Sequence, residues 1–231
     1  MLKELKKNVF KANLEIVNEG LVIHTWGNVS GRDPETGFIV IKPSGISYKL
    51  MKPEDMVVLD PDGKIVEGKF KPSTDAPTHL LLYRMFGSIG GIVHTHSTYA
   101  TSWAQAGKDI PAFGTTHADH FYGEVPCTRK LTDKETVKDY EINTGRVIVE
   151  RLGKKDPLAV PAVLVNGHGP FCWGIDAEEA VYNAIALEEI ARMAFCTVLM
   201  GKKEPVDDYL LDKHFNRKHG KDAYYGQKKK E

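Results

Sequence analysis

The spacing of apolar residues along the chain predicts three long helices. From residue 2 to 18, apolar side chains recur three or four positions apart, which is the pattern of an amphipathic helix. A second helix is predicted from about 77 to 86, because polar residues followed by Pro77 are typical of a helix start. The longest helix is predicted from about 177 to 200, with Asp176 as its N-cap and Gly201 as its stop.

Short apolar runs between these helices predict strands, at residues 37–42, 56–60, 64–67, 91–96 and 162–165. The tripeptide Pro-Asp-Gly joins the second run to the third as a hairpin, so part of the sheet is expected to be antiparallel. Strands and helices are interspersed without a strict βαβ repeat, and no linker or internal repeat interrupts them. We therefore expect an α/β fold with a mixed sheet, helices on both of its faces, and a single domain over residues 1–231.

The net charge and the number and spacing of cysteines indicate which partners and which cellular compartment to expect. Lys plus Arg number 31 and Asp plus Glu number 31, so the formal net charge is zero. This balance predicts no nucleic-acid partner and no membrane surface, and no apolar run approaches the roughly 20 residues of a membrane span. Three isolated cysteines and a charged N-terminus that is not a signal peptide predict a cytoplasmic location. Residues 228–231 are expected to form a disordered basic tail.

Three histidines have the spacing of a metal site. His94 and His96 are two apart in a predicted strand, so both side chains point to the same face, roughly 6.5–7 Å apart along the strand. His168 follows another apolar strand and lies between two glycines. An H-x-H pair is commonly two unrelated histidines, but two unpaired polar rings in a buried strand would be costly. The pattern therefore predicts a catalytic divalent cation, with zinc as the first choice and manganese or cobalt as substitutes.

Two loops have the composition of an anion site. Lys42, Ser44 and Gly45 offer a cation, a hydroxyl group and a free backbone N–H. Ser73 and Thr74 offer hydroxyl groups at the start of the second predicted helix, where exposed N–H groups and the helix dipole favour an anion. The alternative is that the polar residues before this helix only cap it, and the pattern leaves both interpretations open.

Six short motifs resemble those of the class II aldolase and adducin family, in its sugar-phosphate epimerase branch. They are TWGNVS (25–30), IKPSG (41–45), GGIVHTHS (90–97), GTTHAD (114–119), HGPF (168–171) and AYYGQ (223–227). The H-x-H pair with a later H-G is typical of the wider family, and the C-terminal motif is typical of the epimerase branch. The resemblance implies a three-layer α/β/α sandwich with a mixed, largely antiparallel sheet. It also implies a homotetramer with active sites between subunits.

The same resemblance implies roles for individual residues. The ligands of one zinc ion per subunit would be His94, His96, His168 and Asp75. Asp119 and Tyr225 would form the acid–base pair, with Tyr225 reaching into a neighbouring subunit. The substrate, mainly its phosphate, would contact Gly27, Asn28, Lys42, Ser44, Gly45, Ser73, Thr74 and His214. One departure bears on this set: His120 follows Asp119 where the family usually has tyrosine, and its effect on local packing and pKa is open.

The activity that the resemblance implies is the zinc-dependent interconversion of L-ribulose 5-phosphate and D-xylulose 5-phosphate. The hydrogen on carbon 4 is not acidic, because the carbonyl lies two carbons away. Inversion is therefore expected to break and reform the bond between carbons 3 and 4 by retro-aldol and aldol steps. A class II sugar-phosphate aldolase is the alternative, and a non-catalytic adducin-like scaffold a more distant one. Arabinose and ascorbate catabolism both use this activity, and the sequence does not choose between them.

Overall fold

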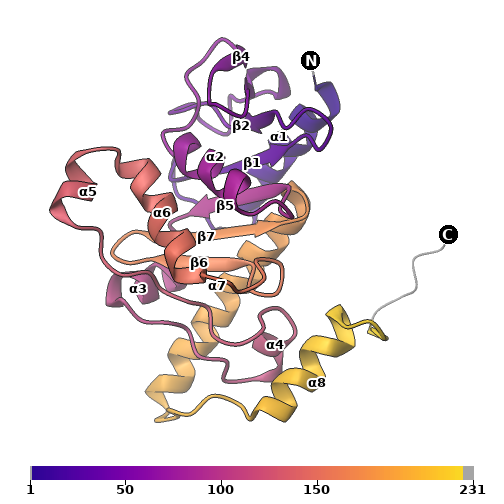
Figure 1. Ribbon diagram of the computed structural model, residues 1–231, viewed down its shortest axis with the longest axis vertical. Coiled ribbons are helices and arrows are strands. Elements are labelled where there is room, and N and C mark those ends of the chain that lie inside the picture. The colour runs from indigo at the N-terminus through magenta and orange to yellow at the C-terminus, as the bar shows by residue number, and fades with distance from the viewer. Residues whose placement is uncertain (1, 226–231) are drawn as a thin grey trace.

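The computed structural model describes residues 2–225 of the chain, and Figure 1 shows their arrangement. The predicted basic tail at 228–231 and the last two residues of the AYYGQ motif lie outside the described residues.

A single seven-stranded sheet forms the centre of the fold. Its strands, in chain order, are β1 (Gly27–Arg32), β2 (Ile39–Ile41), β3 (Val57–Leu59), β4 (Ile65–Glu67), β5 (Gly91–Thr95), β6 (Ala162–Val165) and β7 (Gly169–Gly174). They lie in the order β4-β3-β2-β1-β5-β7-β6, and every ladder between them is antiparallel. The one parallel pair among the described residues is an isolated bridge between Cys127 and Leu164. The expectation of a largely antiparallel sheet is confirmed, but the parallel ladder that a mixed sheet would contain is absent among the described strands, because each strand pairs only with antiparallel neighbouring strands.

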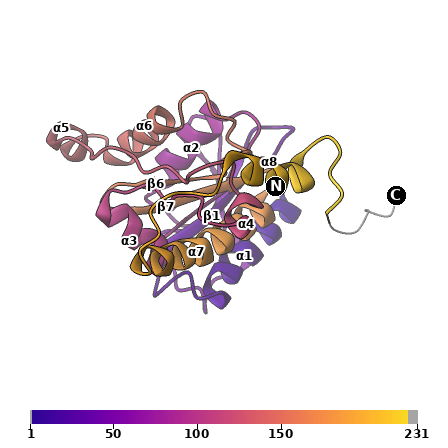
Figure 2. The ribbon, with the colours of Figure 1, turned by 90° about the horizontal axis from the view of Figure 1, so that it is seen from below.

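Helices cover both faces of this sheet, as Figure 2 shows from below. One face packs against α1 (Lys3–Asn18), α3 (Thr98–Ala106) and α7 (Ala177–Leu199), and the other packs against α2 (Ala76–Met85) and α6 (Tyr140–Leu152). Adjacent residues of β5 serve the two faces, since Val93 lies in the core under α1 and α7 while Ile92 lies in the core under α2. The predicted sandwich of three layers is therefore present.

The remaining elements are short or lie outside these layers. They are the 3₁₀ turn η1 (Pro53–Asp55), α4 (Thr115–Ala118), α5 (Asp133–Val137) and α8 (Asp208–His219). In Figure 1, α8 lies beside α4, beyond one end of the sandwich, and has no buried residue. Because α8 leads directly to the AYYGQ motif, its position also fixes where the described part of that motif lies.

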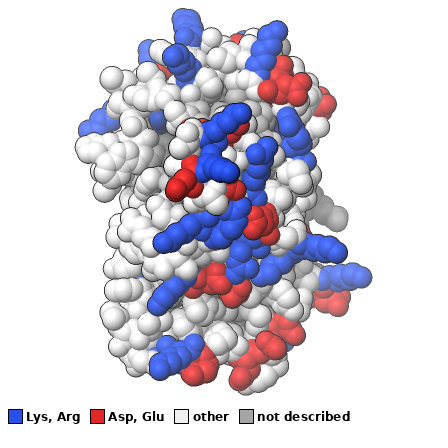
Figure 3. Space-filling view, turned by 60° about the vertical axis from the view of Figure 1, so that its left-hand side comes forward, with Lys and Arg blue, Asp and Glu red and all other residues white. Residues whose placement is uncertain are grey.

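The surface carries mixed charge. Figure 3 shows Lys and Arg side chains across the middle of one face with Asp and Glu side chains among them, in keeping with the balanced composition. Among the described residues, no helix combines the length and the apolar character needed to cross a membrane.

Candidate metal centre and its pocket

Two separate stretches of chain bring three imidazoles together. His94 lies in β5 and His96 directly after it, and their Nε2 atoms are 3.2 Å apart. His168 lies in the turn between β6 and β7, next to Gly167, whose φ of 73° a side chain would disfavour. Its ring centroid is 4.7 Å from that of His94 and 5.1 Å from that of His96. Within the described residues, the ligand atoms of these three histidines all lie within 4.8 Å of one another.

This donor set fits a divalent cation. Burial lowers the pKa of His96 and lowers that of His168 to about 3, with the neighbouring rings adding to the effect. Neutral imidazoles keep a lone pair for a cation, whereas protonated ones would repel it and each other. His94 directs its Nδ1 to the carbonyl oxygen of Pro170 at 3.0 Å, which leaves Nε2 for the shared space.

Asp75 lines the same pocket as the three histidines. It is the N-cap residue of α2, yet its side chain makes no capping bond, and Oδ2 accepts a hydrogen bond from Nδ2 of Asn28 at 2.7 Å instead. Burial alone would raise the pKa of Asp75, but His94, His79 and the Asn28 bond together hold it below its usual range. The carboxylate is therefore ionised and faces the pocket, so the interpretation of Asp75 as only a capping residue finds no support.

The histidines form one wall of a pocket of about 570 Å³. Seven residues that the sequence associated with substrate line the same pocket: Gly27, Asn28, Lys42, Ser44, Gly45, Ser73 and Thr74. Lys42 is 2% exposed, and burial lowers its pKa to about 8. Oδ1 of Asn28 is buried and has no partner among the described residues, so the pocket contains an acceptor that a ligand can satisfy.

Sequence reasoning missed four residues of this lining. Thr25, Trp26, Tyr140 and Glu141 also face the pocket. The first two stand in the TWGNVS motif, but Tyr140 and Glu141 open α6, a helix that the apolar spacing did not reveal. Burial, aided by Asp75, raises the pKa of Tyr140, so its phenol is neutral near pH 7.

Asp119 and His214 are brought together in a different place. Arg217 donates to both carboxylate oxygens of Asp119, at 3.0 and 2.6 Å, and Nδ1 of His214 lies 3.1 Å from Oδ1. Burial alone would raise the pKa of Asp119, but these hydrogen bonds lower it overall. Tyr225 is exposed beside Arg217. These three predicted site residues are absent from the lining of the metal pocket within this chain.

His120 packs on the same side of the molecule as this second cluster. Its ring lies 5.4 Å from that of Tyr182, and burial lowers its pKa to about 4. The open question about His120 is thus answered in part: its ring is neutral near pH 7 and packs on Tyr182, and among the described residues the partners of the Asp119 carboxylate are His214 and Arg217.

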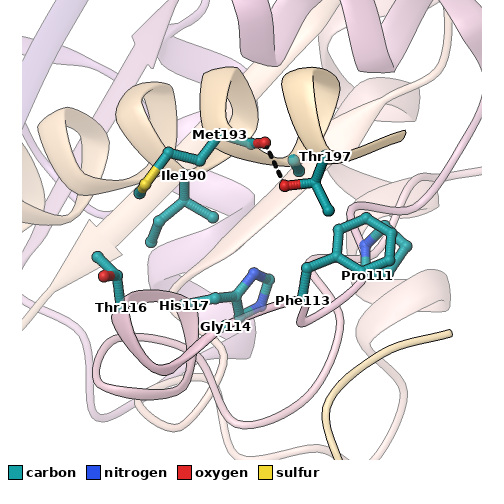
Figure 4. A pocket seen from close by; sticks show the side chains of 9 residues that line it. Pro111, Phe113, Gly114, Thr116, His117, Ile190, Met193 and Thr197 are labelled. Atoms are coloured by element: carbon teal, nitrogen blue, oxygen red, sulfur yellow. Dashed lines mark hydrogen bonds between the residues drawn. The ribbon is translucent and has the colours of Figure 1, made fainter. Parts of the chain in front are cut away.

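A smaller cavity of about 130 Å³ lies between α7 and the segment from Pro111 to His117. Figure 4 shows the His117 ring across this cavity from Ile190 and Thr197. Its Nε2 lies 2.7 Å from the carbonyl oxygen of Gly123, and its buried Nδ1 has no partner among the described residues. This cavity shares no residue with the metal pocket, and it adjoins α4, the short helix that ends just before Asp119.

Comparisons with known proteins agree with this geometry. A family model described as "Class II Aldolase and Adducin N-terminal domain" matches residues 7–195. The chain is 57% identical over 228 residues to "L-ribulose-5-phosphate 4-epimerase UlaF" of Salmonella paratyphi B, covering 98% of this chain and 100% of that protein. Its fold resembles a solved "L-fuculose 1-phosphate aldolase", with a TM-score of 0.79, 26% identity, and coverage of 93% of this chain and 95% of the other. An aldolase of the same name from Glaciozyma antarctica gives a TM-score of 0.75 at 22% identity, covering 93% and 81%.

Proposed function

Because this chain belongs to the class II aldolase and adducin family, we propose that it is a metal-dependent epimerase that interconverts L-ribulose 5-phosphate and D-xylulose 5-phosphate. The observation that carries the proposal is the full-length similarity to an epimerase of that name, joined to a pocket in which three imidazoles converge. The absence of such ligands would have favoured a non-catalytic scaffold.

The metal would be held by His94, His96 and His168, with Asp75 as a fourth ligand. A divalent cation at this site, zinc by preference, would polarise the ketose carbonyl and stabilise the negative charge left on the three-carbon fragment. The ionised Asp75 adds negative charge beside the three imidazoles, which favours cation binding. Oδ1 of Asn28 would accept a hydrogen bond from a substrate hydroxyl group.

The phosphate group would bind at the part of the pocket wall formed by the segments 42–45 and 73–74. Ser73 and Thr74 precede the N-terminus of α2, where backbone N–H groups and the helix dipole attract an anion. Ser44, Gly45 and Lys42 complete this wall. A phosphate beside the buried ammonium group would keep Lys42 protonated, and the phosphate would stop the two-carbon fragment from leaving during turnover.

Inversion needs one acid–base group on each face of carbon 4. As the bond between carbons 3 and 4 breaks, one group takes the proton of the carbon 4 hydroxyl, and an aldehyde forms there. The aldehyde turns over, the bond reforms on its other face, and the second group returns a proton to the new alkoxide. Asp119 and Tyr225 are the pair we assign to these roles.

Both residues would act in the site of a neighbouring subunit. Asp119 and Tyr225 belong to the cluster formed by α4 and α8, apart from the metal pocket of their own chain. A homotetramer with sites at subunit interfaces would bring this cluster to the metal centre of the next copy. His214, which is held against Asp119, would enter the same shared site.

An aldolase that releases its aldehyde is the second candidate, favoured by the fold similarity to L-fuculose 1-phosphate aldolase. The two activities differ in their products from L-ribulose 5-phosphate. An epimerase yields D-xylulose 5-phosphate, whereas an aldolase of this kind yields dihydroxyacetone and glycolaldehyde phosphate. NMR of the reaction mixture distinguishes them, and accumulation of the two fragments would replace the epimerase assignment with the aldolase.

A further inference from the structure

The three imidazoles of the metal centre are supported unequally. The His94 ring is stacked on Phe171 with centroids 4.2 Å apart, and its Nδ1 is fixed by the backbone oxygen of Pro170. Among the described residues, no backbone oxygen bonds the His168 ring, and its Nδ1 lies 3.3 Å from the hydroxyl oxygen of Tyr140 instead. The orientation of His168 thus depends on a side chain from another element.

This dependence bears on metal binding. An imidazole that offers one nitrogen to a cation carries its proton on the other nitrogen, and a partner for that N–H fixes the tautomer and the ring orientation. His168 needs such a partner more than His94, since it lies in a turn next to a positive-φ glycine rather than within a strand.

We propose that Tyr140 is a positioning residue of the metal centre: its hydroxyl oxygen accepts the Nδ1–H of His168 and so turns Nε2 toward the cation. This inference rests on the proposed metal site, and it adds a residue that neither the sequence motifs nor the donor set identified. The contact that carries this role is the one between the Tyr140 hydroxyl group and the His168 ring, so Tyr140 acts through His168.

The surrounding structure holds Tyr140 firmly in place. Asp139, just before it, has a φ of 56°, a conformation that non-glycine residues adopt only when neighbours impose it. Nδ2 of the buried Asn143 donates to the carbonyl oxygens of Glu135 and Lys138, at 3.0 and 2.8 Å, and so fixes the turn that leads into α6.

A second bond joins the start of α6 to the helix that begins at the metal pocket. Oγ1 of Thr78 in α2 donates to the carbonyl oxygen of Glu141 at 2.6 Å. Tyr140 is therefore presented to His168 from a frame that also carries Asp75 at the N-cap of α2. These hydrogen bonds restrain the backbone at the start of α6. The Tyr140 hydroxyl group is therefore held in a defined position next to the His168 ring.

The test is the zinc affinity of full-length Tyr140→Phe, measured by competition with a chromophoric chelator. Loss of the hydroxyl group should weaken zinc binding by about 10- to 100-fold, the usual cost of losing a partner of a metal-ligating histidine. Tyr122→Phe is the matched control, since it removes a tyrosine hydroxyl that donates to Asp212 at 2.6 Å outside the pocket. It should leave zinc affinity unchanged.

A double-mutant cycle separates positioning from a general loss of structure. If Tyr140 acts through His168, Tyr140→Phe should cost nothing further in a His168→Ala chain, and should keep its full cost in a His96→Ala chain. An equal loss in both backgrounds, or no loss in the single variant, would overturn the inference. Failure of the wild-type protein to bind zinc would instead overturn the metal site itself.

Discussion

Histidines that come from two stretches of chain form the centre of the proposed site, and their spacing in the sequence was sufficient to identify them. The H-x-H pair places two imidazoles in the same pocket because His94 lies in β5 and His96 directly follows the end of that strand. Tyr140 could not be found in this way. Its contact with His168 spans 28 residues and depends on how α6 packs on the sheet, which no local pattern encodes.

His96→Asn should reduce zinc affinity and turnover together. Because the Nε2 atoms of His94 and His96 point at the same space, loss of one should weaken binding by at least about 100-fold, more than the loss of a supporting partner. Chelator competition and the epimerase assay on the same preparation measure both quantities. A variant that keeps full activity with one tightly bound zinc per chain would remove His96 from the ligand set.

At the level of elements, the helices predicted from clear apolar spacing and end signals are present, but several other elements were missed. The helix predicted from 177 to 200 is α7, with the Asp176 side chain accepting from the N–H of Glu179 at 2.8 Å. Strand β1, GNVSGR, has no apolar alternation and was missed, as were β7 with its proline and helices α3, α6 and α8. The two strands are set by pairing with distant strands, whereas α6 does carry an amphipathic pattern, which the prediction overlooked.

Asn13 explains how one of these missed strands is held. Its fully buried side chain in α1 accepts from the N–H of Val29 at 2.9 Å and donates to the carbonyl oxygen of Val29 at 3.1 Å. β1 pairs with β5 from Gly27 to Gly31 but with β2 only from Ser30 to Arg32, so the Asn13 amide bonds the backbone of Val29 just beyond the β2 ladder.

Asn13→Leu should lower the free energy of unfolding by about 2–4 kcal/mol, because two buried backbone groups lose their partners. Asn8→Leu, at an exposed position of the same helix, should change it by less than about 0.5 kcal/mol. Urea denaturation measures both variants. Equal effects would mean that the Asn13 bridge does not stabilise β1.

The turn that carries Asp119 should be sensitive to acid through His117. Burial lowers the pKa of His117 to about 4, from an ordinary value of 6.5. Between about pH 6.5 and pH 4 the His117 imidazole is protonated in the unfolded chain but neutral in the folded chain. The free energy of unfolding is therefore greatest above about pH 6.5 and falls as the pH drops toward about 4.

This group alone should account for a loss of roughly 3 kcal/mol across that interval. His117→Gln should show a correspondingly flatter dependence of the free energy of unfolding on pH, measured in chelator-treated protein. His24→Gln, at an exposed histidine, is the control and should keep the wild-type slope. An unchanged slope in His117→Gln would contradict the assignment of a neutral buried imidazole.

At the scale of the whole molecule, the predicted three-layer sandwich is present, while the predicted site residues fall into two groups within one chain. The metal and phosphate residues share a pocket, but Asp119, His214 and Tyr225 lie with α4 and α8 outside it. Sequence motifs identify residues without saying which copy of the chain uses them. In a single chain the metal pocket and the Asp119 cluster are separate, yet the proposed reaction needs residues from both. The structure therefore raises the question of which subunit supplies Asp119, His214 and Tyr225 to each metal pocket.

Mixing two inactive variants tests the shared site. If Asp119 acts in a neighbouring subunit, co-expressed His96→Asn and Asp119→Asn chains should regain roughly a quarter of wild-type activity, since random assembly pairs an intact metal pocket with an intact Asp119 about that often. Each variant alone should be inactive. Mixed assemblies with no activity would place Asp119 in the site of its own chain. The same experiment with Tyr225→Phe examines Tyr225.

We propose that the three-histidine centre carries out a metal-dependent epimerisation. The most direct measurement is the conversion of L-ribulose 5-phosphate to D-xylulose 5-phosphate by the purified protein, before and after treatment with a chelator and again after zinc is restored. We predict conversion that the chelator abolishes and zinc recovers. Conversion that persists in protein shown to be free of metal, or none at all in zinc-loaded protein, would contradict the account.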